Sequence, residues 1–130
     1  MSKMEEVRTL RGDPGIHYNC AQAVFIPFAK DFGLDRDTAF ALSSQFGSGM
    51  GMGSVCGALT GALMVLGLKG GTPAQRTALI RAFREAHDGE LDCAALLKID
   101  RDKGNKDKKP HCDRMVYDAV QILEAILGEE

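Results

Sequence analysis

Apolar side chains recur at intervals of three and four residues along most of the chain, and this is the spacing of one face of an α-helix. Ala23, Val24 and Phe28 follow this spacing, and so do Val116 and Val120 near the other end of the chain. No stretch of useful length alternates apolar and polar residues, as a strand would. The pattern predicts helices over residues 1–11, about 20–33, about 36–47, 54–69, 73–89, 93–98 and 110–127.

A glycine-rich loop followed by an apolar helix forms the centre of this pattern. Residues 47–53 read GSGMGMG, and residues 55–68 carry no charge before Lys69. A helix that is apolar on every side is typically buried, and Ser54 is the expected N-cap of this one. The sequence therefore predicts an all-α fold, with residues 1–130 forming one compact bundle of five to seven helices around a buried helix at about residues 54–69.

Composition and charge exclude several classes of protein. Acidic residues outnumber basic ones by 18 to 16, giving a net charge of −2, whereas nucleic-acid binders usually carry a basic surface. Residues 1–15 are too polar for a signal peptide, and the central apolar run is too short to span a bilayer. We therefore expect a cytoplasmic protein that neither binds nucleic acid nor inserts into a membrane.

The four cysteines are the candidate chemistry. They form no CxxC pair, but each is predicted to lie in the first turn of a helix, where free N–H groups and the helix dipole stabilise a thiolate. Cys56 follows both the glycine loop and Ser54, so we expect it to be the most thiolate-like, with a lowered pKa. The predicted site residues are Cys20, Cys56, Cys93 and Cys112.

Convergence of these helix starts would allow two kinds of site. One is a thiol–disulfide electron-exchange site, in an oxidoreductase or an electron carrier. The other is a metal site in which the same four thiolates hold zinc or an iron–sulfur cluster. A third interpretation is a helical interaction module whose cysteines are structural, because buried free cysteine is common.

Other residues near the cysteines are secondary candidates. The glycine loop lacks the Lys and Ser/Thr of a phosphate-binding loop, so we expect the backbone at Gly51, Gly53 and Gly57 to approach the site instead. Gly57 and Gly61 share one helical face and are expected to pack closely against another helix. His17 and His111 each lie close to a cysteine and are candidate proton donors or ligands, although a surface position is commoner for a histidine.

The cysteine pattern also resembles that of a known family. The matching segments are NCAQAV at residues 19–24, the glycine loop, CGALTG at residues 56–61, Cys93 with the two leucines after its helix start, and Cys112. Together they are similar to the redox-active family named after its cysteine pattern, C_GCAxxG_C_C, over roughly residues 16–127.

The resemblance implies a small helical protein that is redox-active through its four cysteines. A similar domain occurs in a multihaem electron-transfer protein, where its cysteines are associated with an iron–sulfur cluster. This chain has no CxxCH, so no covalent haem is expected. The sequence is compatible with a redox partner and with a homodimer, and it specifies neither.

Overall fold

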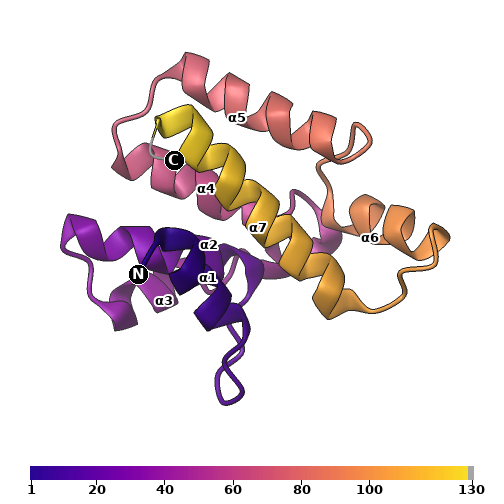
Figure 1. Ribbon diagram of the computed structural model, residues 1–130, viewed down its shortest axis with the longest axis horizontal. Coiled ribbons are helices and arrows are strands. Elements are labelled where there is room, and N and C mark those ends of the chain that lie inside the picture. The colour runs from indigo at the N-terminus through magenta and orange to yellow at the C-terminus, as the bar shows by residue number, and fades with distance from the viewer. Residues whose placement is uncertain (129–130) are drawn as a thin grey trace.

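The computed structural model describes residues 1–128, and their regular structure is helical (Figure 1). The only extended pairing among these residues is an isolated antiparallel bridge between Val55 and Asp92. The all-α prediction is therefore confirmed. The elements are α1 (Lys3–Arg11), α2 (Cys20–Ala29), the 3-10 turn η1 (Lys30–Phe32), α3 (Arg36–Ser43), the π-type turn η2 (Gly49–Gly53), α4 (Gly57–Leu68), α5 (Pro73–Ala86), α6 (Cys93–Asp102) and α7 (Lys108–Leu127).

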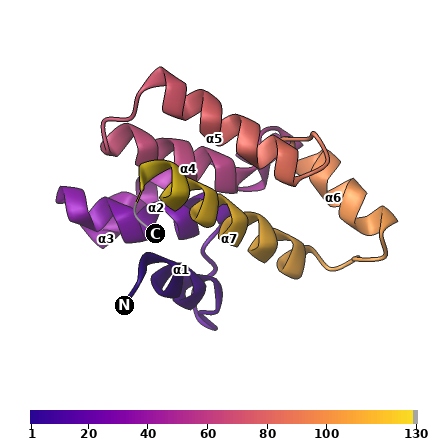
Figure 2. The same cartoon turned by 45° about the horizontal axis from the view of Figure 1, so that its top comes forward.

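Two buried helices, α2 and α4, lie at the centre of the bundle. Every residue of α2 is buried, and α4 buries most of its residues as well. Figure 2 shows α5 on one side of this pair and α1 on the other, with α7 lying across the bundle between them. The predicted buried central helix is thus present, and α2 shares its central position.

Two glycines of α4 allow the close approach of α2. A Cβ atom added at Gly61 would lie 2.8 Å from the backbone oxygen of Ala21, and one at Gly57 would lie 2.8 Å from the backbone oxygen of Phe46 and 3.3 Å from the Cβ of Cys20. Only glycine fits at such separations. The predicted helix–helix packing by Gly57 and Gly61 is therefore confirmed, and it places the start of α4 beside the start of α2.

The start of α4 differs from the prediction. The helix begins at Gly57 with Cys56 as its N-cap, and Ser54 instead follows the π-type turn. The difference arises because the residues before α4 are extended and pair with the residues before α6 through the bridge between Val55 and Asp92. A sequence pattern of helical periodicity does not reveal such a pairing between distant segments.

The boundaries of the last two helices also differ from the prediction. α6 continues to Asp102, and α7 begins at Lys108, so much of the segment expected to be a loop is helical. Pro110 is the third residue of α7, where its missing N–H removes no intrahelical hydrogen bond. Consequently Cys112 is the fifth residue of α7 and lies beyond the first turn.

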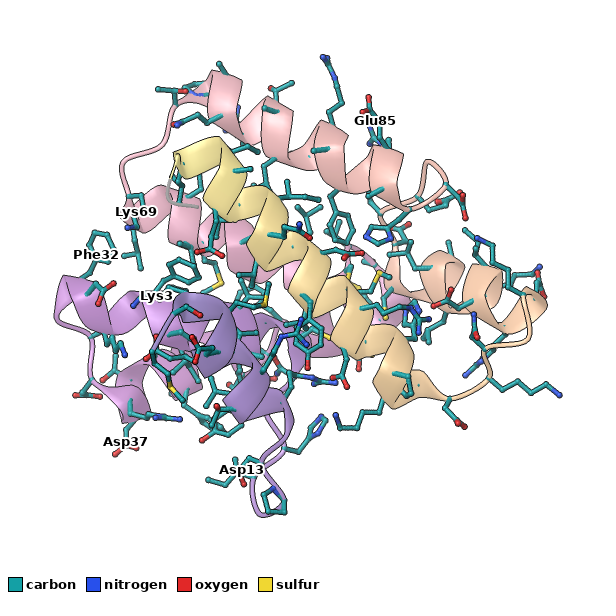
Figure 3. The ribbon with its side chains drawn as sticks, in the orientation of Figure 1. Lys3, Asp13, Phe32, Asp37, Lys69 and Glu85 are labelled. Atoms are coloured by element: carbon teal, nitrogen blue, oxygen red, sulfur yellow. The ribbon has the colours of Figure 1, made fainter. Side chains whose placement is uncertain are left out.

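Charged side chains cover the outside of the bundle (Figure 3). Asp13, Asp37 and Glu85 point away from the ribbon, whereas the ammonium of Lys69 lies 5.7 Å from the ring centre of Phe32. Within residues 1–128 no helix is long and apolar enough to cross a bilayer.

Candidate functional site

The four cysteines line a single cavity of about 320 Å³, which we call the thiol cavity. It lies where the starts of α2, α4 and α6 approach the first two turns of α7. All four side chains are buried free thiols: Cys56 is 3% exposed and the other three are each 9% exposed. Cysteines that are far apart in the sequence therefore line one cavity.

Cys20 is held by the cap of α2. The side-chain oxygen of Asn19 accepts a hydrogen bond from the backbone N–H of Gln22 at 2.8 Å, and the Gln22 side chain accepts one from the Asn19 N–H at 2.9 Å. The Asn19 amide also donates to the backbone oxygen of Ser44 at 3.1 Å. Because the cap is joined to the segment after α3, the position of Cys20 as the first residue of α2 is fixed.

Cys56 and Cys93 are held next to each other by the bridge between their segments. The N–H of Cys56 donates to the Leu91 oxygen at 2.8 Å, and the N–H of Cys93 donates to the Ser54 oxygen at 2.6 Å. In an antiparallel pair, residues on diagonal positions of one face are near neighbours. The backbone pairing therefore fixes the two cysteines as one unit.

Cys112 is brought to the cavity by α7, which Arg11 attaches to the rest of the site. The guanidinium of Arg11 donates to the Asp113 carboxylate at 2.7 Å and to the backbone oxygen of Tyr18 at 2.7 Å. Arg11 is itself buried, so this contact ties the end of α1, the segment before α2 and the second turn of α7 together. It sets the position of Cys112 opposite Cys20.

A hydrogen bond joins Cys20 and Cys112 and separates their acidities. The bond favours the thiolate of Cys112 and lowers the pKa of Cys112 to about 6 against the opposing effect of burial. The same bond, together with burial, raises the pKa of Cys20 well above its ordinary value. Electrostatic interactions with His111, Arg11 and Lys108 lower the pKa of Cys112 further.

The expectation that Cys56 has a lowered pKa is wrong. Burial raises the pKa of Cys56 to about 12, although hydrogen bonds from the backbone N–H groups of Ala58 and Leu59 oppose the rise. Burial also raises the pKa of Cys93. Desolvation outweighs the helix N-terminus at these positions, and the thiolate-like cysteine is Cys112, which is not in a first turn.

Both histidines named from the sequence line the thiol cavity, in different states of burial. His17 is exposed, whereas His111 is 2% exposed. The Nδ1 atom of His111 pairs with the Asp100 carboxylate, which also pairs with Arg114. A surface position is thus wrong for His111, which is buried in the lining of the thiol cavity.

The three glycines named as backbone contributors take different positions. Gly57 lines the thiol cavity, whereas Gly51 and Gly53 are not among its lining residues. A side chain at Gly51 would meet no atom within 4 Å, and one at Gly53 would meet the Cβ of Ala94 at 3.1 Å. The backbone donors that reach Cys56 come from α4 instead.

Sequence reasoning did not identify the basic residues of the site. Arg11 ends the first helix, and Lys108 and Lys109 lie in a segment of mixed charge that was expected to be a surface loop. The one signal in the sequence that could have identified Lys108 and Lys109 is their position just before Cys112. Arg11 carried no such signal, because its partner Asp113 is distant in the sequence.

A metal ion requires several ligands placed around one point. Among residues 1–128, no three side chains of His, Cys, Asp or Glu are placed to hold one ion. The four thiols as they stand therefore do not form a preformed zinc site. Cys20 interacts with Cys112 instead, and the backbone bridge joins the segments that carry Cys56 and Cys93.

Comparison with known proteins places the cysteines in a family. Neither the curated proteins nor the solved structures include a significant match to this chain. A family model described as "Putative redox-active protein (C_GCAxxG_C_C)" matches residues 18–126, a range that includes all four cysteines and nearly the whole chain. This chain therefore belongs to the C_GCAxxG_C_C family.

Proposed function

We propose that this protein exchanges electrons through a thiol–disulfide couple, with Cys112 as the attacking thiolate and Cys20 as the resolving thiol. The observation that carries the proposal is that Cys20 and Cys112 meet in the thiol cavity through a side-chain hydrogen bond, which lowers the pKa of Cys112 and raises that of Cys20. It supplies a thiolate near neutral pH and a protonated partner next to it. An attacking thiol whose pKa lies near the ambient pH is the most effective one.

The reaction requires a disulfide as the oxidant. The Cys112 thiolate attacks one sulfur of that disulfide, forming a mixed disulfide and releasing the other half as a thiolate. Cys20 then passes its proton to a departing thiolate and attacks the Cys112 sulfur. The second half of the oxidant leaves, a disulfide between Cys20 and Cys112 remains, and two electrons have passed from the protein to the oxidant.

Cys56 and Cys93 supply the second dithiol in this proposal. Their raised pKa values keep both protonated at neutral pH, and the backbone bridge holds them together. Electrostatic interaction of Cys93 with Cys112 indicates that the two pairs are close to each other. Reduction of the Cys20–Cys112 disulfide by this second pair would pass through the same cavity. A reducing cytoplasm, which the sequence predicts, would keep all four as free thiols.

Disulfide mapping tests the proposal. The reduced protein is oxidised under anaerobic conditions with one equivalent of 2-hydroxyethyl disulfide, and its peptides are mapped by mass spectrometry. We expect a Cys20–Cys112 disulfide that dithiothreitol reverses, and in Cys20→Ser a mixed disulfide that stays on Cys112. Cys93→Ser is the matched control and should still form the Cys20–Cys112 bond.

Two results would contradict the proposal. One is oxidation that leaves both Cys20 and Cys112 as free thiols. The other is stoichiometric iron and sulfide, or zinc, bound by all four thiolates in protein purified without oxygen. That result would support the metal-binding interpretation in place of thiol–disulfide exchange.

A further inference from the structure

The thiol cavity is lined by several basic groups. Among residues 1–128, its lining contains no Asp or Glu, although acidic residues outnumber basic ones in the whole chain. Positive charge is therefore concentrated at the one cavity that contains the thiols. The basic lining residues are Arg11, His17, Lys108, Lys109 and His111.

Most of these basic groups have a carboxylate partner just outside the lining. Arg11 and Lys109 share Asp113, at 2.7 Å and 2.9 Å respectively, and His111 pairs with Asp100. Two cations thus share one carboxylate, which leaves an excess of positive charge on this side of the cavity. Lys108 adds a further positive charge. The positive charge therefore exceeds the single negative charge of the Cys112 thiolate.

Lys108 is the basic residue best placed to meet a ligand. It is exposed, and its ammonium contacts a hydroxyl group, the Oγ of Ser48, at 3.3 Å. Its charge also lowers the pKa values of both Cys93 and Cys112, so it lies near both sulfurs. As the first residue of the 20-residue helix α7, it adds its charge to the positive end of the helix dipole.

From this charge distribution we propose that the thiol cavity takes a small anionic disulfide, one whose carboxylate groups are recognised by Lys108 while its sulfur meets Cys112. The inference rests on the proposed function and adds the class of substrate to it. A volume of about 320 Å³ accommodates a small molecule. The carboxylate–ammonium contact at the entrance steers the anion inward and offsets its repulsion by the thiolate.

The step balances as described for the proposed reaction. The Cys112 thiolate forms a bond to one sulfur of the anionic disulfide, and a carboxylate-bearing thiolate leaves. Cys20 displaces the second carboxylate-bearing thiolate from Cys112 and gives up its proton to it. The oxidant is reduced to one thiolate and one thiol, which carries the Cys20 proton, and the protein gains one disulfide.

Three disulfides with the same two-carbon arms test the inference. They are 3,3′-dithiodipropionate, which is anionic, 2-hydroxyethyl disulfide, which is neutral, and cystamine, which is cationic. The rate constant with which each disulfide oxidises the reduced protein is measured at fixed ionic strength. It is divided by the rate constant with which the same disulfide oxidises a neutral small thiol. This division removes the intrinsic reactivity of each disulfide. We expect the anionic disulfide to exceed the cationic one by on the order of tenfold, and added salt to reduce the difference.

Two lysine variants identify the recognising residue. In Lys108→Gln the ratio of anionic to neutral rates should fall severalfold, and using the ratio cancels any change in the pKa of Cys112. Lys106→Gln is the matched control, because Lys106 is an exposed lysine outside the cavity lining, and its ratio should be unchanged.

The outcomes separate the two proposals. Equal normalised rates for the three disulfides, or equal ratios in the two lysine variants, would overturn the anionic-substrate inference and leave the thiol–disulfide function standing. Failure of all three disulfides to produce a Cys20–Cys112 bond would overturn the proposed function itself.

Discussion

Cys20, from the first buried helix, and Cys112, from the last helix, are joined by a side-chain hydrogen bond that lowers the pKa of Cys112 and raises that of Cys20. The bond makes one sulfur nucleophilic and keeps the other protonated. A thiolate beside a thiol is the arrangement that a two-step exchange reaction needs. The remaining groups of the site act on this pair through charge or through position.

Removal of the donor should raise the pKa of Cys112. In Cys20→Ala the sulfur of Cys112 loses the hydrogen bond that contributes most to its acidity, and we expect its pKa to rise by roughly one unit or more. In Cys20→Ser a hydroxyl donor is retained, so the rise should be smaller. Rates of iodoacetamide labelling measured against pH give the value for each variant, and an unchanged pKa in Cys20→Ala would show that the bond has no such role.

His111 should lower the pKa of Cys112 by less than the hydrogen bond with Cys20 does. His111 lies beside Cys112 and lowers its pKa electrostatically, so His111→Gln should raise the pKa of Cys112 by less than Cys20→Ala does. His87→Gln is the control, because His87 is a histidine that lies outside the thiol cavity. The same labelling experiment measures both variants, and equal shifts in the two would argue against a specific effect of His111.

Close packing of α2 against α4 should make Gly61 intolerant of a side chain. The added methyl in Gly61→Ala would lie 2.8 Å from the Ala21 oxygen, and we expect the free energy of unfolding to fall by about 1–3 kcal/mol. Gly67 lies in the same helix, is exposed, and has no atom within 4 Å of the added methyl. Gly67→Ala should therefore raise the free energy of unfolding by about 0.5–1 kcal/mol. Urea denaturation compares the two, and equal effects would contradict the packing described.

The N-cap of α2 should affect both the free energy of unfolding and the pKa of Cys112. Asn19→Ala and Thr72→Ala each remove an N-cap with a complete capping box, and each should cost about 1 kcal/mol of stability. Asn19 precedes Cys20, whereas Thr72 starts α5, which contributes no residue to the thiol cavity. Only Asn19→Ala should therefore also raise the pKa of Cys112. A shift in neither variant, despite similar losses of stability, would show that the cap does not position Cys20.

The helical pattern was sufficient to predict the architecture and part of the site. Local signals identified the close-packed glycines Gly57 and Gly61 and the all-α class. These features depend on residues within a few positions of one another, which is the range over which helical periodicity acts.

The pKa values of the cysteines could not be predicted from local sequence patterns. The sequence placed Cys56 at a helix start and indicated a thiolate there, but burial, which depends on the whole fold, raises its pKa. Cys112 becomes acidic through a donor from α2 and charges from α1 and α7. Pairings such as Arg11 with Asp113 join distant parts of the chain and leave no local pattern.

Labelling of the four wild-type cysteines against pH, resolved by mass spectrometry, tests the central claim most directly. Because the pKa of Cys112 is lowered from 9.0 to about 6, its thiolate persists as pH falls from 9 and is lost only as pH passes below about 6. Cys56, with a pKa of about 12, should stay unreactive until strongly alkaline pH. We predict that Cys112 is labelled first, with a midpoint near pH 6. A midpoint near pH 9 for Cys112, or earlier labelling of Cys56, would contradict the account.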